Sequence, residues 1–199
     1  MKLHFALASP FVRKVLACAI IRGIADRIEK VDTNPHASPA DLLRDNPLSK
    51  VPALVTDDGL ALFESDVICE YLDSIGDAPA LFPPAGPARW RALRLQALAD
   101  GIMHAGVQRR MQITLPQDEG RAAYFARQRE VTKRAVDVLE QEAETLEGAP
   151  TIGTVAVGCA LGYLDFRFPD EAWRPGHPKV TAWYEKAAKQ AWLTQTAPA

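Results

Sequence analysis

Cysteine is scarce in this sequence, which has only Cys18, Cys69 and Cys159 among its 199 residues. No two of them have CxxC spacing, so the pattern indicates neither a disulfide framework nor a cysteine zinc site, and we expect no metal. Few and widely separated thiols are typical of a reducing compartment, which favours the cytoplasm. Because free cysteine is among the most often buried residue types, we interpret all three as core residues.

The sequence also lacks a long hydrophobic run and an excess of charge of either sign. The densest apolar stretch, residues 155–164, is about half the length of a membrane-spanning helix. Its 23 basic and 25 acidic residues give a net charge of −2, without the concentrated basic field that nucleic-acid binding requires. These absences predict a protein with no membrane span and no nucleic-acid partner.

The rest of the composition is ordinary for a globular protein. Proline becomes frequent near residue 80. Hydrophobic residues make up 48% of the chain and charged residues 24%. Four prolines lie within residues 79–87, and proline cannot continue a helix. We therefore predict a linker at 79–87 between a domain at 1–78 and a domain at 88–199.

The two predicted domains differ in their hydrophobic periodicity. In the first, strand-like segments at 2–7, 27–31, 52–55 and 60–63 alternate with helices that begin near Ser9, Ser38 and Ser65. In the second, helical patterns cover 88–111 and 118–146, and others begin near 154 and 178. The helix near 154 is apolar all round, so we expect it to be central and buried. The sequence thus predicts an α+β protein, with the order βαβαββα followed by an all-α domain.

The turn between the first strand and the first helix is one candidate site. Ser9 is a favoured N-cap and Pro10 a favoured first helical residue. Free N–H groups and the helix dipole favour an anion there, such as a thiolate, and a serine hydroxyl can donate a hydrogen bond to it. The alternative interpretation is that Ser9 only caps the helix.

Two further turns are suited to a peptide-like ligand. A cis bond between Val51 and Pro52 would present the backbone N–H and C=O of Val51 to an extended peptide; the alternative is a trans proline that opens an edge strand. Ser65, as an N-cap, and its neighbour Glu64 stand at a predicted helix start. A carboxylate suits the helix N-terminus and an ammonium suits the acid, as in an α-amino-acid head group. The alternative is an ordinary N-cap.

Five segments resemble the glutathione S-transferase family in their order and spacing, over essentially the whole chain: SPFVRKV, NPLSKVPAL, LFESDVICEYL, LADGIMHAG and TVAVGCALGYLDFRF. The closest resemblance is to bacterial members with a serine at the start of the first helix. It implies a thioredoxin-like N-terminal domain, an all-helical C-terminal domain, a homodimer, and glutathione as co-substrate.

The resemblance also implies roles for individual residues. Ser9 corresponds to the hydroxyl that activates the thiol, and Val51 to the residue that pairs its backbone with the cysteinyl part of glutathione. Glu64 and Ser65 correspond to the residues that hold the γ-glutamyl head. Lys50 and His36 are expected to face the glycyl carboxylate.

A glutathione transferase acting on a small hydrophobic electrophile is the function that the resemblance implies. A serine at position 9 cannot form a mixed disulfide, so the sulfur of glutathione itself is the expected nucleophile. The alternatives are a glutathione-dependent peroxidase or isomerase, and a non-catalytic glutathione-binding or interaction protein on the same fold.

Two features of the second domain carry expectations of their own. Thr154 stands where family members commonly have aspartate, so we expect the reciprocal cap with Thr151 to be weaker by about 1 kcal/mol. We interpret Arg109 and Arg110 as a solvent-exposed charged patch on a helix.

Overall fold

The structure, a computed structural model, describes residues 1–198, which form two compact units. The first unit is Met1–Arg89 with the segment that begins at Ala191, and the second is Trp90–Gln190. The elements in chain order are β1 (Lys2–Phe5), α1 (Pro10–Ile21), η1 (Ala25–Arg27), β2 (Glu29–Asp32), η2 (Pro35–Ala37), α2 (Ala40–Asp45), β3 (Ala53–Val55), β4 (Ala61–Leu62), α3 (Ser65–Ile75), α4 (Gly86–Gln112), α5 (Glu119–Gln141), η3 (Ala143–Leu146), α6 (Ile152–Arg167), α7 (Pro178–Ala187) and α8 (Ala191–Thr194). The predicted α+β class and the order βαβαββα are confirmed.

The sheet of the first unit has the strand order β2-β1-β3-β4. β1 and β2 are parallel, whereas β3 is antiparallel to both β1 and β4. The strand predicted at 27–31 begins two residues later, because Ala25–Arg27 forms a 3₁₀ turn. The strand predicted at 2–7 ends at Phe5, before the turn that leads into α1.

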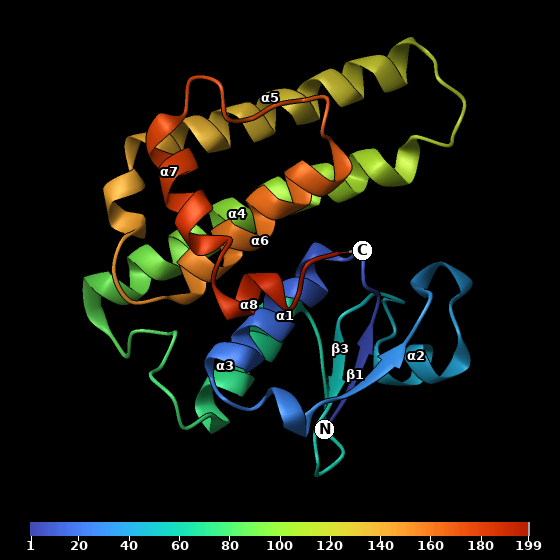
Figure 1. Ribbon diagram of the computed structural model, residues 1–199. Coiled ribbons are helices and arrows are strands. Elements are labelled where there is room, and N and C mark those ends of the chain that lie inside the picture. Colours follow the sequence, from blue (N-terminus) through green and yellow to red (C-terminus); the bar gives the residue numbers. More distant parts are fainter. Residues whose placement is uncertain (199) are drawn as a thin grey trace. The chain divides into compact units, whose positions relative to one another are not determined.

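Helices α1 and α3 pack against each other on one side of the strands, with α2 on the other side (Figure 1). The thiol of Cys18 on α1 lies 3.6 Å from the backbone carbonyl of Cys69 on α3. The hydrogen bond with Cys69, followed by burial, raises the pKa of Cys18 well above its ordinary value. All three cysteines are buried, which confirms their interpretation as core residues.

Arg13 on α1 holds the C-terminal segment against the first unit. Its guanidinium donates to the carbonyl oxygen of Leu193 at 3.0 Å and to the hydroxyl of Thr196 at 3.3 Å. The short helix α8, for which the sequence pattern gave no expectation, is therefore attached to α1.

The buried His4 connects β1 to the residue that follows β2 and to the last residue of α2. Nδ1 of His4 lies 3.0 Å from the hydroxyl of Thr33, and Nε2 lies 3.0 Å from the carboxylate of Asp45. The hydroxyl of Thr33 donates to the carbonyl of Val31, so its oxygen accepts from His4. His4 thus contacts Thr33 through one ring nitrogen and Asp45 through the other, which fixes the end of α2 relative to β1.

This network predicts a loss of stability in acid. A hydrogen bond from Arg44, opposed by burial and aided by His4, lowers the pKa of Asp45. A lowered folded-state pKa contributes stability that is complete above the ordinary aspartate pKa of about 3.9 and is lost as the pH falls through the folded value. We expect Asp45→Asn to lower the free energy of unfolding by about 1 kcal/mol at pH 7, and by less at pH 3. Urea unfolding at several pH values measures this difference; Asp26→Asn, at an exposed position, is the control, and a pH-independent loss in Asp45→Asn would contradict it.

The second unit is built around α6, in which every residue from Ile152 to Leu164 is buried. This confirms the expectation of a central helix. The helix begins with a reciprocal cap, in which the N–H of Thr154 donates to the hydroxyl of Thr151 at 3.3 Å and the N–H of Thr151 donates to the hydroxyl of Thr154 at 2.8 Å. The two threonines thus complete a reciprocal cap, and the expected energetic cost of Thr154 in place of aspartate stays a prediction.

The interpretation of the arginine pair on α4 is wrong for Arg109. Its side chain is 6% exposed, and its guanidinium lies over the ring of Phe168 at 4.0 Å from the ring centre and pairs with Glu171. Arg110 is exposed, as expected. The sequence could not indicate this difference because both partners of Arg109 come from the segment after α6.

None of the helices within residues 1–198 is both long enough and apolar enough to cross a membrane.

Candidate functional site

The register of the sheet brings the predicted site segments to one end of the strands, the end at which β1 finishes, which we call the sheet edge. His4 in β1 pairs with Ala53 in β3, so the end of β1 faces the residues that precede β3. Leu62 in β4 pairs with Leu54, so the residues after β4 reach the same edge. Phe5 pairs with Asp32 at the end of the parallel strand β2, which places the turn after β2 there too. The segments that carry Ser9, His36, Lys50–Val51 and Glu64–Ser65 all leave the sheet at this edge.

The hydroxyl of Ser9 caps α1 as an acceptor, so its O–H can still donate a hydrogen bond to a ligand. Its hydroxyl oxygen accepts from the N–H of Val12 at 3.3 Å, and its backbone is extended. An N-cap uses a lone pair of the hydroxyl and leaves the O–H free to donate. Because the side chain is only half-buried, capping and donation to a ligand are compatible.

The backbone of Val51 is available to a ligand. The Val51–Pro52 bond is cis, which excludes the alternative of a trans proline. Neither the N–H nor the C=O of Val51 has a hydrogen-bond partner within residues 1–198. The preceding turn is shaped by Asn46, which is 1% exposed and whose amide donates to the carbonyl of Lys50 at 2.9 Å. The sequence pattern did not single out Asn46, although an asparagine before a proline is a known turn signal.

The start of α3 differs from the expected cap. The N-cap residue is Glu64 rather than Ser65, and no side chain caps the helix. Ser65 is the first helical residue, with 3% of its surface exposed. The Phe63–Glu64 peptide bond is also cis. An uncapped N-terminus presents N–H groups and the positive end of the helix dipole, which suits a carboxylate.

Two basic residues, Lys50 and His36, were expected to face a carboxylate of the ligand. Nζ of Lys50 lies 3.5 Å from the carboxylate of Glu64, so the structure brings these two residues together. His36 is exposed on the 3₁₀ turn η2. The hydroxyl of Ser49 donates to the carbonyl of Pro35 at 3.0 Å, which holds the His36 turn beside the Lys50 segment.

Lys14 is a charged residue at this site that the sequence pattern did not reveal. Its side chain is fully buried, and its Nζ lies 2.6 Å from the carboxylate of Asp66 in the first turn of α3. A lysine is almost never fully buried unless it is paired. This ion pair links α1 to the start of α3, and so fixes the Ser9 turn relative to Ser65.

Within residues 1–198, no three histidine, cysteine, aspartate or glutamate side chains are grouped closely enough to hold a metal ion.

Comparison with known proteins finds a match to the same family in each half of the chain. Residues 8–75 match the model of the glutathione S-transferase N-terminal domain, and residues 122–186 match that of the C-terminal domain. The uncharacterised GST-like protein YibF of Escherichia coli K12 is 33% identical over 201 aligned residues, covering 100% of this chain and 98% of YibF.

Two solved structures from Pseudomonas fluorescens Pf-5 are similar along the whole chain. One, a glutathione transferase family member with bound glutathione, is 41% identical with a TM-score of 0.93, covering 100% of this chain and 98% of the other. The other, with bound S-(propanoic acid)-glutathione, is 39% identical with a TM-score of 0.89, and both chains are covered completely. The thioredoxin-like N-terminal domain, the helical C-terminal domain and these matches lead to one conclusion: the chain belongs to the glutathione S-transferase family.

Proposed function

We propose that this protein binds glutathione at the sheet edge described above and transfers its thiolate to a small hydrophobic electrophile. The observation that carries the proposal is the meeting of three complementary groups at one edge: the hydroxyl of Ser9, the unpaired backbone of Val51 and the uncapped start of α3. They match the thiol, the peptide backbone and the α-amino-acid head of glutathione.

Each group performs one task in this proposal. Ser9 donates to the sulfur and, with the dipole of α1, favours the thiolate. Val51 pairs backbone to backbone with the cysteinyl residue. The N-terminus of α3 and Ser65 take the γ-glutamyl carboxylate, while Glu64 pairs with its ammonium. Lys50 and His36 face the glycyl carboxylate.

The bound S-substituted glutathione in the Pseudomonas fluorescens relative supports sulfur as the reacting atom. The thiol proton first leaves to solvent, and the thiolate then attacks an electrophilic carbon. As the carbon–sulfur bond forms, either the bond to a leaving group breaks and the group departs with its electron pair, or a carbon–carbon double bond opens and its electron pair takes up a proton from solvent. A peroxidase or an isomerase would use the same thiolate, so turnover with a panel of electrophiles and hydroperoxides decides between these reactions. The homodimer and the cytoplasmic location stay predictions.

The head-group assignment makes a quantitative prediction. Glu64→Gln keeps the shape of the side chain and removes its charge, so glutathione should bind about tenfold more weakly, because charge-assisted hydrogen bonds contribute roughly 1.5–3 kcal/mol. Calorimetric titration measures the affinity. Glu70→Gln, an exposed glutamate on the same helix, is the matched control and should bind as the wild type does. Equal affinities in all three proteins would contradict the assignment.

A further inference from the structure

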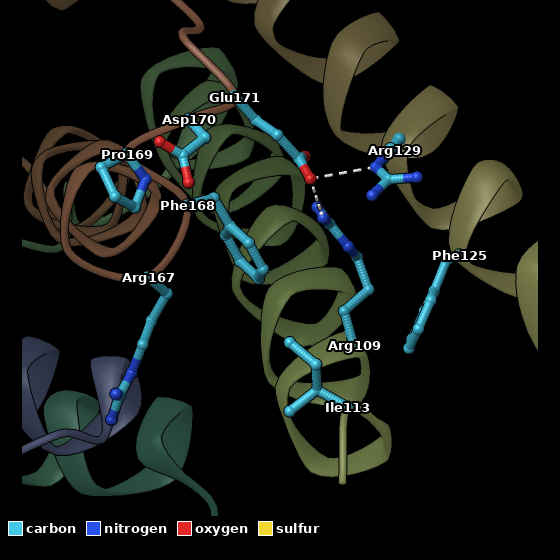
Figure 2. A pocket seen from close by; sticks show the side chains of 9 residues that line it. All are labelled: Arg109, Ile113, Phe125, Arg129, Arg167, Phe168, Pro169, Asp170 and Glu171. Carbon is cyan, nitrogen blue, oxygen red and sulfur yellow. Dashed lines mark hydrogen bonds and ion pairs between the residues drawn. The ribbon is translucent and has the colours of Figure 1, made fainter. Parts of the chain in front are cut away.

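The second unit contains a pocket of about 210 Å³ at the end of α4 (Figure 2). Arg109 of α4 and Ile113, just after the end of α4, form one wall, and Phe125 and Arg129 of α5 form another. The turn after α6 closes it with Phe168 and Glu171. All of these residues belong to the same compact unit.

Two arginines in this pocket hold a single carboxylate oxygen. Oε1 of Glu171 accepts from Nε of Arg129 at 3.0 Å and from the guanidinium of Arg109, and Figure 2 shows both arginines directed at it. Within residues 1–198 the second oxygen of Glu171 accepts no hydrogen bond, and its side chain is 36% exposed. The site therefore already recognises a carboxylate, and the carboxylate that it holds is at the surface.

The charge of this group is stable at neutral pH. Burial by itself would raise the pKa of Glu171, but the hydrogen bonds from Arg109 and Arg129 hold it below its ordinary value. Glu171 is thus an anion that neutralises only one of the two arginines. The two arginines carry one more positive charge than Glu171 neutralises, which favours an anionic ligand over a neutral one.

The rest of the pocket fits an aromatic ring. Phe125, Phe168 and Ile113 supply apolar walls, and the guanidinium of Arg109 already stacks on the ring of Phe168. The volume is below the range of roughly 300–1,000 Å³ usual for drug-sized ligands, so a single ring is the appropriate size. The other two charged residues of the lining, Arg167 and Asp170, are opposite in sign, and Arg167 points away from Glu171 in Figure 2.

We propose that this pocket binds a small aromatic monocarboxylate, whose carboxylate takes the place of Glu171 on Arg109 and Arg129 while its ring packs against Phe125 and Phe168. Glu171 is the internal competitor: it extends from an exposed turn and leaves the arginines when the ligand arrives. The planar guanidinium groups match the two oxygens of a carboxylate, which accounts for the choice of anion.

Fluorine NMR titration with 4-fluorobenzoate tests the proposal, with neutral 4-fluorobenzamide as the matched ligand and inorganic phosphate as the competing anion. Wild type should bind 4-fluorobenzoate at least tenfold more tightly than the amide, because the amide lacks the charge that the arginines recognise. Phosphate should not displace it, because phosphate has no ring. The titrations contain no glutathione, so their outcome is independent of the proposed transferase activity.

Three variants connect this binding to the named residues. Glu171→Gln removes the internal anion and should tighten 4-fluorobenzoate binding about fivefold or more. Arg129→Gln should weaken it about tenfold, since a charge-assisted hydrogen bond is lost; Arg129 is 54% exposed, so the fold tolerates this change. Arg127→Gln, at an exposed position one half-turn away on α5, should bind as the wild type does. Equal binding of acid and amide, or no tightening in Glu171→Gln, would overturn the proposal.

Discussion

Replacing Ser9 by alanine is expected to raise the pKa of the thiol of bound glutathione and to lower the conjugation rate at neutral pH about 100-fold. The variant removes the hydroxyl that we propose as the donor to sulfur and leaves the dipole of α1 in place. Loss of one donor to a developing or resident anion typically reduces the rate by about 10²–10³. The ultraviolet absorbance of the thiolate, titrated against pH in the glutathione complex, measures the pKa directly.

Two variants separate the chemistry of Ser9 from its role as a cap. Alanine also removes the hydrogen bond to Val12, which stabilises α1 by about 1 kcal/mol. Glycine is a better N-cap and loses only a few tenths of a kcal/mol, so Ser9→Gly should show the same shift in thiol pKa with less loss of stability. Ser9→Thr keeps the hydroxyl and should retain most of the activity. Identical titration curves for the wild type, alanine and glycine proteins, with glutathione bound in each, would show that another group activates the thiol.

Replacing Gly153 by valine is expected to destabilise the protein by about 3 kcal/mol, as overpacking of a tight contact does. Gly153 lies in the first turn of α6, where it meets the backbone of α4. A Cβ at this position would lie 2.6 Å from the carbonyl oxygen of Ala92 and 2.9 Å from Cβ of Leu95. Backbone cannot move aside as a side-chain tip can, so α4 and α6 must separate. Urea unfolding followed by circular dichroism measures the loss.

The matched control lies on α4 itself. A Cβ at Gly101 would meet nothing within 4 Å, so Gly101→Ala should stabilise the protein by about 0.5–1 kcal/mol through the helix preference of alanine alone. If the free energy of unfolding falls in Gly153→Val and rises in Gly101→Ala, the loss is attributed to the contact between α4 and α6. A stabilised Gly153→Val protein would contradict this close approach.

The turns that form the candidate site could be predicted from the sequence because each depends on residues that are neighbours in the chain. Ser9-Pro10 predicts a helix start after a strand, and the structure places the cap there. The cis bond at Val51–Pro52, one of the two alternatives that the sequence left open, is present in the structure, whereas the role of the Glu64 turn in ligand binding stays a prediction. The expected cap by Ser65 was wrong, since a pattern of residue types does not fix a helix boundary to one residue.

The sequence by itself determined the order of elements, the buried character of α6 and the candidate residues at the sheet edge, because hydrophobic periodicity and turn chemistry act between near neighbours. Only the tertiary structure decided which distant residues meet. It buried Lys14 against Asp66, attached α8 to α1 through Arg13, and placed Glu171 between two arginines from α4 and α5. The physical reason is the same in each case: a charged side chain taken partly or wholly out of water needs an opposite charge or hydrogen-bond acceptors, and packing brings these partners from a part of the chain that local patterns cannot indicate.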